Sequence, residues 1–220
     1  MENVKHTSLP WHLNGEGFIL NYWISPQFTH KYSKMGILPT TFGRLVQVIL
    51  VRYHNSPVGP YDELLILDHP LKNINHLSTI PKIYVSNQIS VDEGRHHWGI
   101  PKELAQFEWR RHNHQLFCYI SHQDQELSLH LKFSKNNFSR AISSKFIPDT
   151  LLNIRQYHDH VQYDFQPQFC GTLGLISQAH WKNTQDIFPD FSKARFLKGF
   201  YAPNFELIFP EAIKQHLLVK

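Results

Sequence analysis

The feature that most constrains the fold is a series of strand-like segments separated by short loops rich in proline, glycine and asparagine. Residues 43–54 (GRLVQVILVRYH) are β-branched and nearly continuous in apolar character, which is typical of a strand buried on both faces. Residues 126–134 (ELSLHLKFS) alternate with period two, so that their three leucines and Phe133 share one face. The chain is therefore expected to be rich in β-structure.

Further segments complete this pattern. Strands are expected over residues 18–24, 61–68 and 81–90, and residues 107–121 are expected to form a hairpin that turns near Asn113. The pattern predicts an α+β fold that is predominantly antiparallel β, and it leaves a barrel and a sandwich open as alternatives.

Helical signals are few, so the helices are expected to be peripheral. Residues 25–39 begin with Ser25 as N-cap and a proline at the first helical position, and they meet a glycine stop at Gly36. Residues 210–220 begin with a proline, and Ile213 and Leu217 share a helical face, which predicts a short C-terminal helix.

Composition sets the class of protein. The 220 residues fit a single domain spanning 1–220, and 41% hydrophobic with 18% charged residues exclude intrinsic disorder. The net charge of +4 is scattered, with Arg110–Arg111 as the one adjacent cationic pair, so no nucleic-acid partner is expected. The longest apolar run, residues 45–51, is too short to span a bilayer, and residues 1–17 have no apolar core of signal-peptide length. We expect a cytoplasmic protein without a membrane partner.

Cysteine and histidine suggest metal or disulfide chemistry only weakly. Cys118 and Cys170 lie outside any CxxC pattern and are expected to be free thiols. Among the 16 histidines, two His-x-His pairs could each supply two metal ligands on a strand face: His112/His114 and His158/His160. No HExxH motif accompanies them, so we interpret them as surface or pocket-rim histidines and expect no metal.

The segment SPVGPYDELL, residues 56–65, carries a candidate catalytic carboxylate. In a strand, Tyr61, Glu63 and Leu65 share one face, so Glu63 stands between an aromatic and an aliphatic residue. If that face is inward, Glu63 is a carboxylate in apolar surroundings. An outward face with a solvated Glu63 remains the alternative.

The segment GRHHWGIPKELAQF, residues 94–107, carries a candidate nucleophile. Gly94 and Gly99 bracket what is expected to be a turn, and Pro101 fixes the backbone just before Lys102. A neutral amine can attack a ketone and form an imine, but in water a lysine is almost entirely protonated at neutral pH. Lys102 is therefore either a desolvated nucleophile or, like most lysines, a surface residue.

The two segments together resemble the acetoacetate decarboxylase superfamily. SPVGPYDELLIL resembles the strand that carries the family's active-site glutamate, which falls on Glu63. GRHHWGIPKELAQF resembles the family's Gly-Arg followed by Pro-Lys and Leu, in which the lysine is the Schiff-base nucleophile, and that lysine falls on Lys102. The segment FELIFPEA, residues 205–212, resembles the family's closing strand and helix.

The resemblance implies a closed, barrel-like sheet with Lys102 in an interior pocket, and a homo-oligomer. It also implies no metal and no organic cofactor, because the protein's own amine performs the chemistry. The expected partner is a small or medium carbonyl compound or β-keto acid. As substrate-binding residues we name Tyr61, Tyr84, Arg95, Trp98 and Trp23.

Two departures from the family pattern leave the reaction open. The family's second lysine is replaced by Glu103, and its early-strand arginine, suited to a substrate carboxylate, falls on Trp23 or a neighbour. Arg52 or Arg95 could take the place of that arginine. The reaction could be decarboxylation or another imine-dependent step such as aldol cleavage, condensation or dehydration. The alternative functions are a non-catalytic small-molecule-binding barrel and, third, a metal-dependent enzyme.

Overall fold

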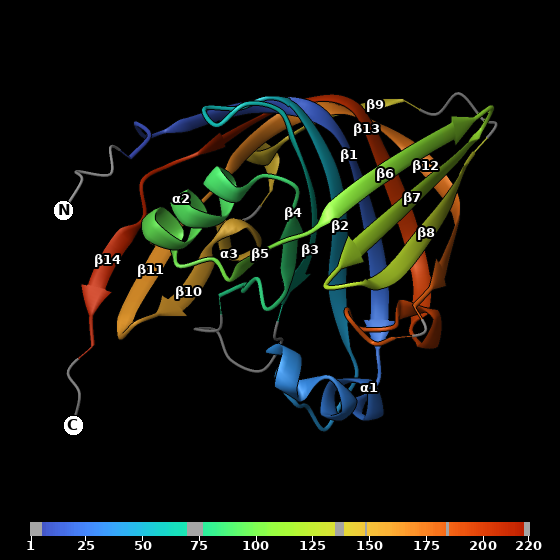
Figure 1. Cartoon of the computed structure of the whole chain (residues 1–220), viewed down its shortest axis with the longest axis horizontal. Coiled ribbons are helices and arrows are strands. Elements are labelled where there is room, and N and C mark those ends of the chain that lie inside the picture. Colours follow the sequence, from blue (N-terminus) through green and yellow to red (C-terminus); the bar gives the residue numbers. More distant parts are fainter. Residues whose placement is uncertain (1–5, 70–76, 135–138, 148, 184, 218–220) are drawn as a thin grey trace.

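The structure of the protein, a computed structural model, describes residues 6–69, 77–134, 139–147, 149–183 and 185–217. Its main element is a curved 11-stranded sheet with the strand order β5-β4-β3-β2-β1-β13-β12-β8-β7-β6, and β9 pairs with β12 (Figure 1). The strands are β1 (Trp11–Ile24), β2 (Arg44–Asn55), β3 (Tyr61–Asp68), β4 (Ile83–Val85), β5 (Lys102–Leu104), β6 (Gln106–His112), β7 (Gln115–His122), β8 (Gln125–Phe133), β9 (Arg140–Ser143), β12 (Gln168–Lys182) and β13 (Arg195–Phe209).

The β-rich, antiparallel character is confirmed. Every pairing in the large sheet is antiparallel except that of β4 with β5. The predicted hairpin is β6–β7, and Asn113 in its turn has a positive φ of 50°. The alternating strand is β8, whose three leucines are buried. Strand β2 is half-buried rather than fully buried on its second face, as at Leu45 and Ile49.

The closed barrel is not confirmed. Within the described residues the order of strands ends at β5 on one side and β6 on the other, and no ladder joins them. These two strands are consecutive in the chain and are separated by Ala105, whose N–H donates to the carbonyl oxygen of Val85 at 2.9 Å. The chain therefore passes through this one residue from one edge strand of the sheet to the other.

The residues expected to form a C-terminal helix instead contribute a strand to a second, three-stranded antiparallel sheet. It has the order β10 (Ile154–His158), β11 (Val161–Phe165), β14 (Ile213–His216). The helix over residues 210–220 is wrong as far as the described residues extend, because residues 213–216 pair with β11 along its length. A partner strand supplies hydrogen bonds that outweigh a short helical pattern. Residues 218–220 lie outside the described part.

The helices are few and peripheral, as expected. They are α1 (Pro26–Lys31), α2 (Gln88–Trp98) and α3 (Asp149–Leu152), with 3-10 turns at Ser33–Met35, Ser144–Phe146 and Phe191–Lys193. Helix α1 confirms the predicted N-cap, since the Ser25 hydroxyl accepts from the Phe28 N–H at 3.2 Å. None of the described helices combines the length and apolar character needed to cross a membrane.

Helix α2 corrects two expectations. The strand expected over residues 81–90 is limited to β4, and the turn expected between Gly94 and Gly99 is the second half of α2. The Asn87 side chain caps the helix by accepting from the Ser90 N–H at 3.2 Å, and Gly99 ends it in the left-handed region with φ of 61°. Both are ordinary helix signals, but the segment between them has too few apolar residues for a clear helical period.

Two apolar cores lie on opposite faces of β3. Leu64 and Ile66 face the larger core inside the curve of the large sheet. Tyr61 and Leu65 face a second core, which also takes residues from α2 and from the three-stranded sheet. Figure 1 shows α2 and the strands β10, β11 and β14 together on this side of the large sheet. The candidate site lies in this second core.

Candidate active site

Lys102 and Glu63 meet in the second core. The Nζ atom of Lys102 lies 3.3 Å from Oε2 of Glu63, and each residue is 4% exposed. Strand pairing explains the meeting: Glu63 is opposite Val85 on β4, and Lys102 is paired with Ile83 two residues earlier. Alternation puts all four side chains on one face, and the long lysine stem spans β4. The inward alternative for Glu63 is therefore the one observed.

Three aromatic side chains surround this pair. The Tyr53 hydroxyl donates to Oε1 of Glu63 at 3.1 Å. The Nζ atom of Lys102 lies 5.3 Å from the ring centroid of Tyr61 and 6.0 Å from that of Trp11. Burial raises the pKa of Tyr53 and of Tyr61 well above the usual value, and the Glu63 charge raises both further. Both phenols therefore remain protonated and can act as hydrogen-bond donors.

Helix α2 covers the lysine. The Ser90 hydroxyl accepts from Nζ of Lys102 at 3.0 Å, one helical turn before Gly94. Gly94 lies against the lysine stem so closely that a Cβ atom there would be 2.6 Å from Cδ of Lys102. Arg95 donates from its guanidinium to the backbone carbonyl oxygen of Lys102 at 2.6 Å. These contacts explain why Gly94 and Arg95 stand together in the sequence. The glycine leaves room for the Lys102 side chain, and the arginine binds the Lys102 backbone.

Arg95 and Trp98 were named as substrate-binding residues, and the structure gives both of them supporting contacts. Arg95 uses one guanidinium nitrogen on the Lys102 backbone rather than facing the amine. Trp98 is buried in the second core, where its ring packs edge-on against Trp11 with centroids 5.0 Å apart. Its indole N–H donates to the carbonyl oxygen of Pro210 at 2.7 Å.

Tyr84 and Trp23, also named as substrate-binding residues, are not brought to Lys102. Tyr84 is paired with Leu64 and so faces the larger core, where its hydroxyl donates to the carbonyl oxygen of Ile187 at 2.7 Å. Trp23 is 42% exposed, between two residues of β1 that enter the larger core. The alternation of strand faces separates both residues from the site, and we leave them out of it.

Glu103, which replaces the second family lysine, points away from Lys102. Its carboxylate lies 2.6 Å from Nζ of Lys82 and 3.4 Å from Nε2 of His122. Arg52 also faces away, since it pairs at 3.8 Å with Asp62, whose side chain leaves β3 on the face opposite Glu63. Among the described residues, Glu63 and Ser90 are the side chains within ion-pair or hydrogen-bond distance of the Lys102 amine.

Three residues of the site were missed from the sequence: Tyr53, Ser90 and Trp11. Tyr53 could have been found, because antiparallel pairing of β2 with β3 puts it directly opposite Tyr61. Ser90 could have been found from its spacing of four residues before Gly94, had α2 been predicted. Trp11 carries no comparable local signal.

Lys102 and Glu63 are both buried, and helix α2 lies over the lysine. Neither of two surface hollows, of about 580 Å³ beside α2 and about 430 Å³ beside β5, is lined by Lys102 or Glu63. The first hollow does include Arg95 and His96 of α2. An amine and a carboxylate in contact, out of water and under a helix, can exchange a proton with each other and with a bound molecule.

Potential metal ligands gather beside this site rather than in it. One ligand atom from each of His6, Glu93 and His97 lies within 4.8 Å of the other two. Among the residues that the structure describes, this is the one group of three or more potential metal ligands. Burial would raise the pKa of Glu93, but hydrogen bonds from Thr7 and His6 and the proximity of His97 lower it to about 2. Neither His-x-His pair enters such a group among the residues described.

Both cysteines are free thiols, as expected. Cys118 is buried in the larger core, and this burial raises its pKa well above the usual value. Cys170 is exposed. Neither contacts the Lys102–Glu63 pair, so the described thiols take no part in the site.

Comparison with known proteins identifies the family. The profile of the family described as "Acetoacetate decarboxylase (ADC)" matches residues 3–170. No curated protein sequence matched the chain. The solved structure of acetoacetate decarboxylase from Legionella pneumophila superimposes with a TM-score of 0.64 at 13% identity, covering 94% of this chain and 88% of that one. A second acetoacetate decarboxylase structure superimposes with a TM-score of 0.71 at 12% identity, covering 98% of this chain and 93% of that one.

A third similar structure is the enduracididine biosynthesis enzyme MppR, complexed with the condensation product of pyruvate and imidazole 4-carboxaldehyde. It superimposes with a TM-score of 0.65 at 12% identity, covering 97% of this chain and 92% of that one. At these identities the superpositions show a shared fold, whereas the profile match extends over most of the sequence. The chain belongs to the acetoacetate decarboxylase family.

Proposed function

We propose that the protein is an acetoacetate decarboxylase-like enzyme in which Lys102 forms a Schiff base with a small carbonyl compound or keto acid. The observation that carries this proposal is the buried contact of 3.3 Å between Nζ of Lys102 and Oε2 of Glu63. Family membership and the MppR structures with pyruvate and with a pyruvate condensation product support a keto acid as the substrate class.

An amine has to lose its proton before it can attack a carbonyl carbon, and Glu63 is placed to take that proton from Lys102. Moving one proton from the lysine ammonium to the glutamate carboxylate gives an amine and a carboxylic acid without changing the net charge of the site. Tyr53 stabilises either form of Glu63 through its hydrogen bond.

The proposed reaction begins with the formation of an imine on Lys102. The Lys102 nitrogen bonds to the carbonyl carbon, and the resulting carbinolamine loses water to give a protonated imine. Glu63 supplies the proton for the departing water and takes it back on hydrolysis. With a β-keto acid, the bond to the carboxylate carbon breaks, carbon dioxide leaves, and the electron pair moves into the imine to form an enamine. Protonation of the enamine carbon and hydrolysis release the product and the amine.

Other imine-dependent reactions use the same first step. If the enamine attacks an aldehyde, a carbon–carbon bond forms, and the reverse direction is aldol cleavage. Among the described residues, no guanidinium faces the Lys102 amine. This favours substrates that need no arginine to bind a carboxylate distant from the reacting carbonyl group. The homo-oligomer implied by the family is likewise part of this proposal, and light scattering of the purified protein tests it.

The experiment for this function compares turnover in wild type and in Lys102→Met. Carbon dioxide release from β-keto acids and consumption of pyruvate with aldehydes are measured for both proteins. We expect turnover in wild type and none above background in Lys102→Met, with Lys31→Met, a surface lysine of α1, as the matched control. Turnover that survives Lys102→Met would contradict the proposal.

A second candidate function is a binding protein that has lost turnover. The observation that favours it is Glu103, which stands in place of the family's second lysine and pairs with Lys82 and His122 rather than with Lys102. It predicts that keto acids bind to wild type without any reaction and bind equally to Lys102→Met, as calorimetry would show.

A further inference from the structure

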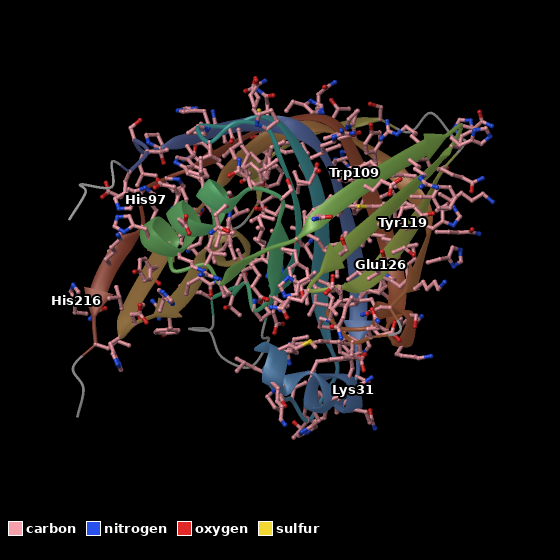
Figure 2. All side chains as sticks on the ribbon, in the orientation of Figure 1. Lys31, His97, Trp109, Tyr119, Glu126 and His216 are labelled. Atoms are coloured by element: carbon pink, nitrogen blue, oxygen red, sulfur yellow. The ribbon has the colours of Figure 1, made fainter. Side chains whose placement is uncertain are left out.

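A compact group of metal-ligating side chains lies where the N-terminal segment crosses α2. The Nδ1 atom of His6 is 2.8 Å from Oε1 of Glu93, and Nε2 of His97 is 3.1 Å from Oε2 of the same carboxylate. Glu93 and His97 are one helical turn apart, so they project from one face of α2. Figure 2 labels His97 on α2, at the end of the molecule that also holds β14.

The three side chains are held in place and open on one side. Glu93 and His97 have side chains that are 5% and 10% exposed, while that of His6 is 36% exposed. The His6 ring stacks on His96, with centroids 3.6 Å apart and planes 2° from parallel. Two ligands therefore come from the buried helix face, and the third closes the group from the solvent side.

We propose that His6, Glu93 and His97 form a binding site for a divalent transition metal ion, with zinc as the ion that fits the donors best. Two imidazole nitrogens and one carboxylate are a donor set that zinc accepts, leaving a fourth position for water or another ligand. Calcium and magnesium prefer oxygen donors alone, so the two histidines disfavour both ions.

A tetrahedral zinc requires the three ligand atoms to become more evenly spaced. With Zn–N and Zn–O bonds of about 2.0–2.1 Å, neighbouring ligand atoms stand roughly 3.3 Å apart. The contacts of 2.8 and 3.1 Å end on different oxygens of Glu93, and one ligand atom from each residue lies within 4.8 Å of the other two, so the widest separation has to shorten on binding. The His6 and His97 rings have centroids 5.7 Å apart and planes inclined by 72°. Two imidazoles on one tetrahedral ion have centroids roughly 5 Å apart, which is near this separation.

Metal binding here would fasten the N-terminal segment to the helix that covers Lys102. Thr7 already donates its backbone N–H to Oε2 of Glu93 at 2.8 Å, and its hydroxyl donates to the same oxygen. The indole of Trp11 donates to the Thr7 hydroxyl at 2.9 Å, and its ring lies 6.0 Å from Nζ of Lys102. The site therefore adjoins the lysine site without touching it, and its role is structural.

The experiment measures zinc binding directly and does not depend on turnover. Untagged full-length protein, stripped with a chelator, is titrated with zinc in competition with a chromophoric chelator, and cobalt replaces zinc for absorption spectra. We expect one equivalent of tightly bound zinc and a cobalt spectrum of tetrahedral intensity. His6→Phe keeps the stacking on His96 but removes the ligand, so zinc affinity should fall at least about tenfold. His97→Ala should have the same effect.

His12→Ala is the matched control, because His12 is an exposed N-terminal histidine outside the group. It should bind zinc as wild type does. Circular dichroism shows whether each variant is folded, and the partly exposed His6 is the safest position in this respect. The proposal is overturned if wild type binds no stoichiometric zinc, if His6→Phe binds it as tightly as wild type, or if His12→Ala weakens binding equally.

Discussion

Gly94 lies directly on the side chain of Lys102, so closely that a methyl group at residue 94 would overlap the lysine stem. The contact joins a helix to a strand that begins eight residues later. It sets the direction in which the amine points toward Glu63 and Ser90. The position of the nucleophile therefore depends on the absence of a side chain at this point of α2.

Gly94→Ala should impair imine formation more than folding. Overpacking a buried contact costs about 1–3 kcal/mol, and the better helix propensity of alanine offsets about 1 kcal/mol of that. A lysine displaced by about 1 Å should lose about 100-fold in reactivity. Rates of adduct formation and urea unfolding check this, with Asp92→Ala, an exposed substitution in the same helix, as control. Unchanged reactivity in folded Gly94→Ala would show that this contact does not position the amine.

Glu63→Gln should leave the protein folded but slow the reaction. Glutamine has nearly the same shape and keeps an oxygen to accept from Tyr53, whereas it cannot take or give the proton. General acid–base catalysis typically contributes about 10²–10⁴-fold, and a loss of that size in kcat is expected. Steady-state kinetics with the best keto acid measures it. A loss smaller than about tenfold would remove Glu63 from the proton-transfer role.

Alkaline pH should destabilise the protein through Tyr53 and Tyr61. Because burial raises both pKa values above that of an unfolded tyrosine, the unfolded state releases these protons first. Stability from the two phenols is thus complete below about pH 10 and declines as the pH rises above it. Urea unfolding across this range should show a steep decline that Tyr53→Phe reduces. The exposed Tyr157→Phe should leave the slope as it is, and equal slopes for all three proteins would refute the assignment.

Glu103→Gln should not affect the nucleophile. The Glu103 side chain leaves β5 on the face opposite Lys102 and pairs with Lys82 and His122. Removing its charge breaks a partly exposed ion pair, which costs about 0–1 kcal/mol. Adduct formation on Lys102 should proceed at the wild-type rate, as timed mass spectrometry would show. A large change in that rate would mean that the charge at residue 103 acts on the amine.

The sequence could predict which side chains of the site share a face of their strand, because side chains alternate along a strand. Tyr61, Glu63 and Leu65 share a face because of the strand period, and the pattern of β3 shows this without any tertiary information. The same rule would have separated Tyr84 from Glu63, had the register between β3 and β4 been known. Register depends on non-local pairing, and one residue of shift exchanges the two faces.

Helix α2 and the metal-ligating group could not be predicted in the same way. The segment from Gln88 to Trp98 has capping residues but few apolar ones, and packing over Lys102 rather than periodicity stabilises it. His6 and Glu93 are 87 residues apart, so their contact follows from the path of the folded chain. The C-terminal residues 213–216 show the same limit, because an available partner strand decided their conformation.

The central claim is that Lys102 carries the imine, and reductive trapping tests it most directly. Wild type, Lys102→Arg and the control Lys31→Arg are incubated with pyruvate or acetoacetate, reduced with borohydride, and analysed by peptide mass spectrometry. The account predicts a reduced adduct on Lys102 in wild type and in Lys31→Arg, and no adduct in Lys102→Arg. An unmodified Lys102 in wild type, or an adduct that persists elsewhere in Lys102→Arg at the same yield, would contradict it.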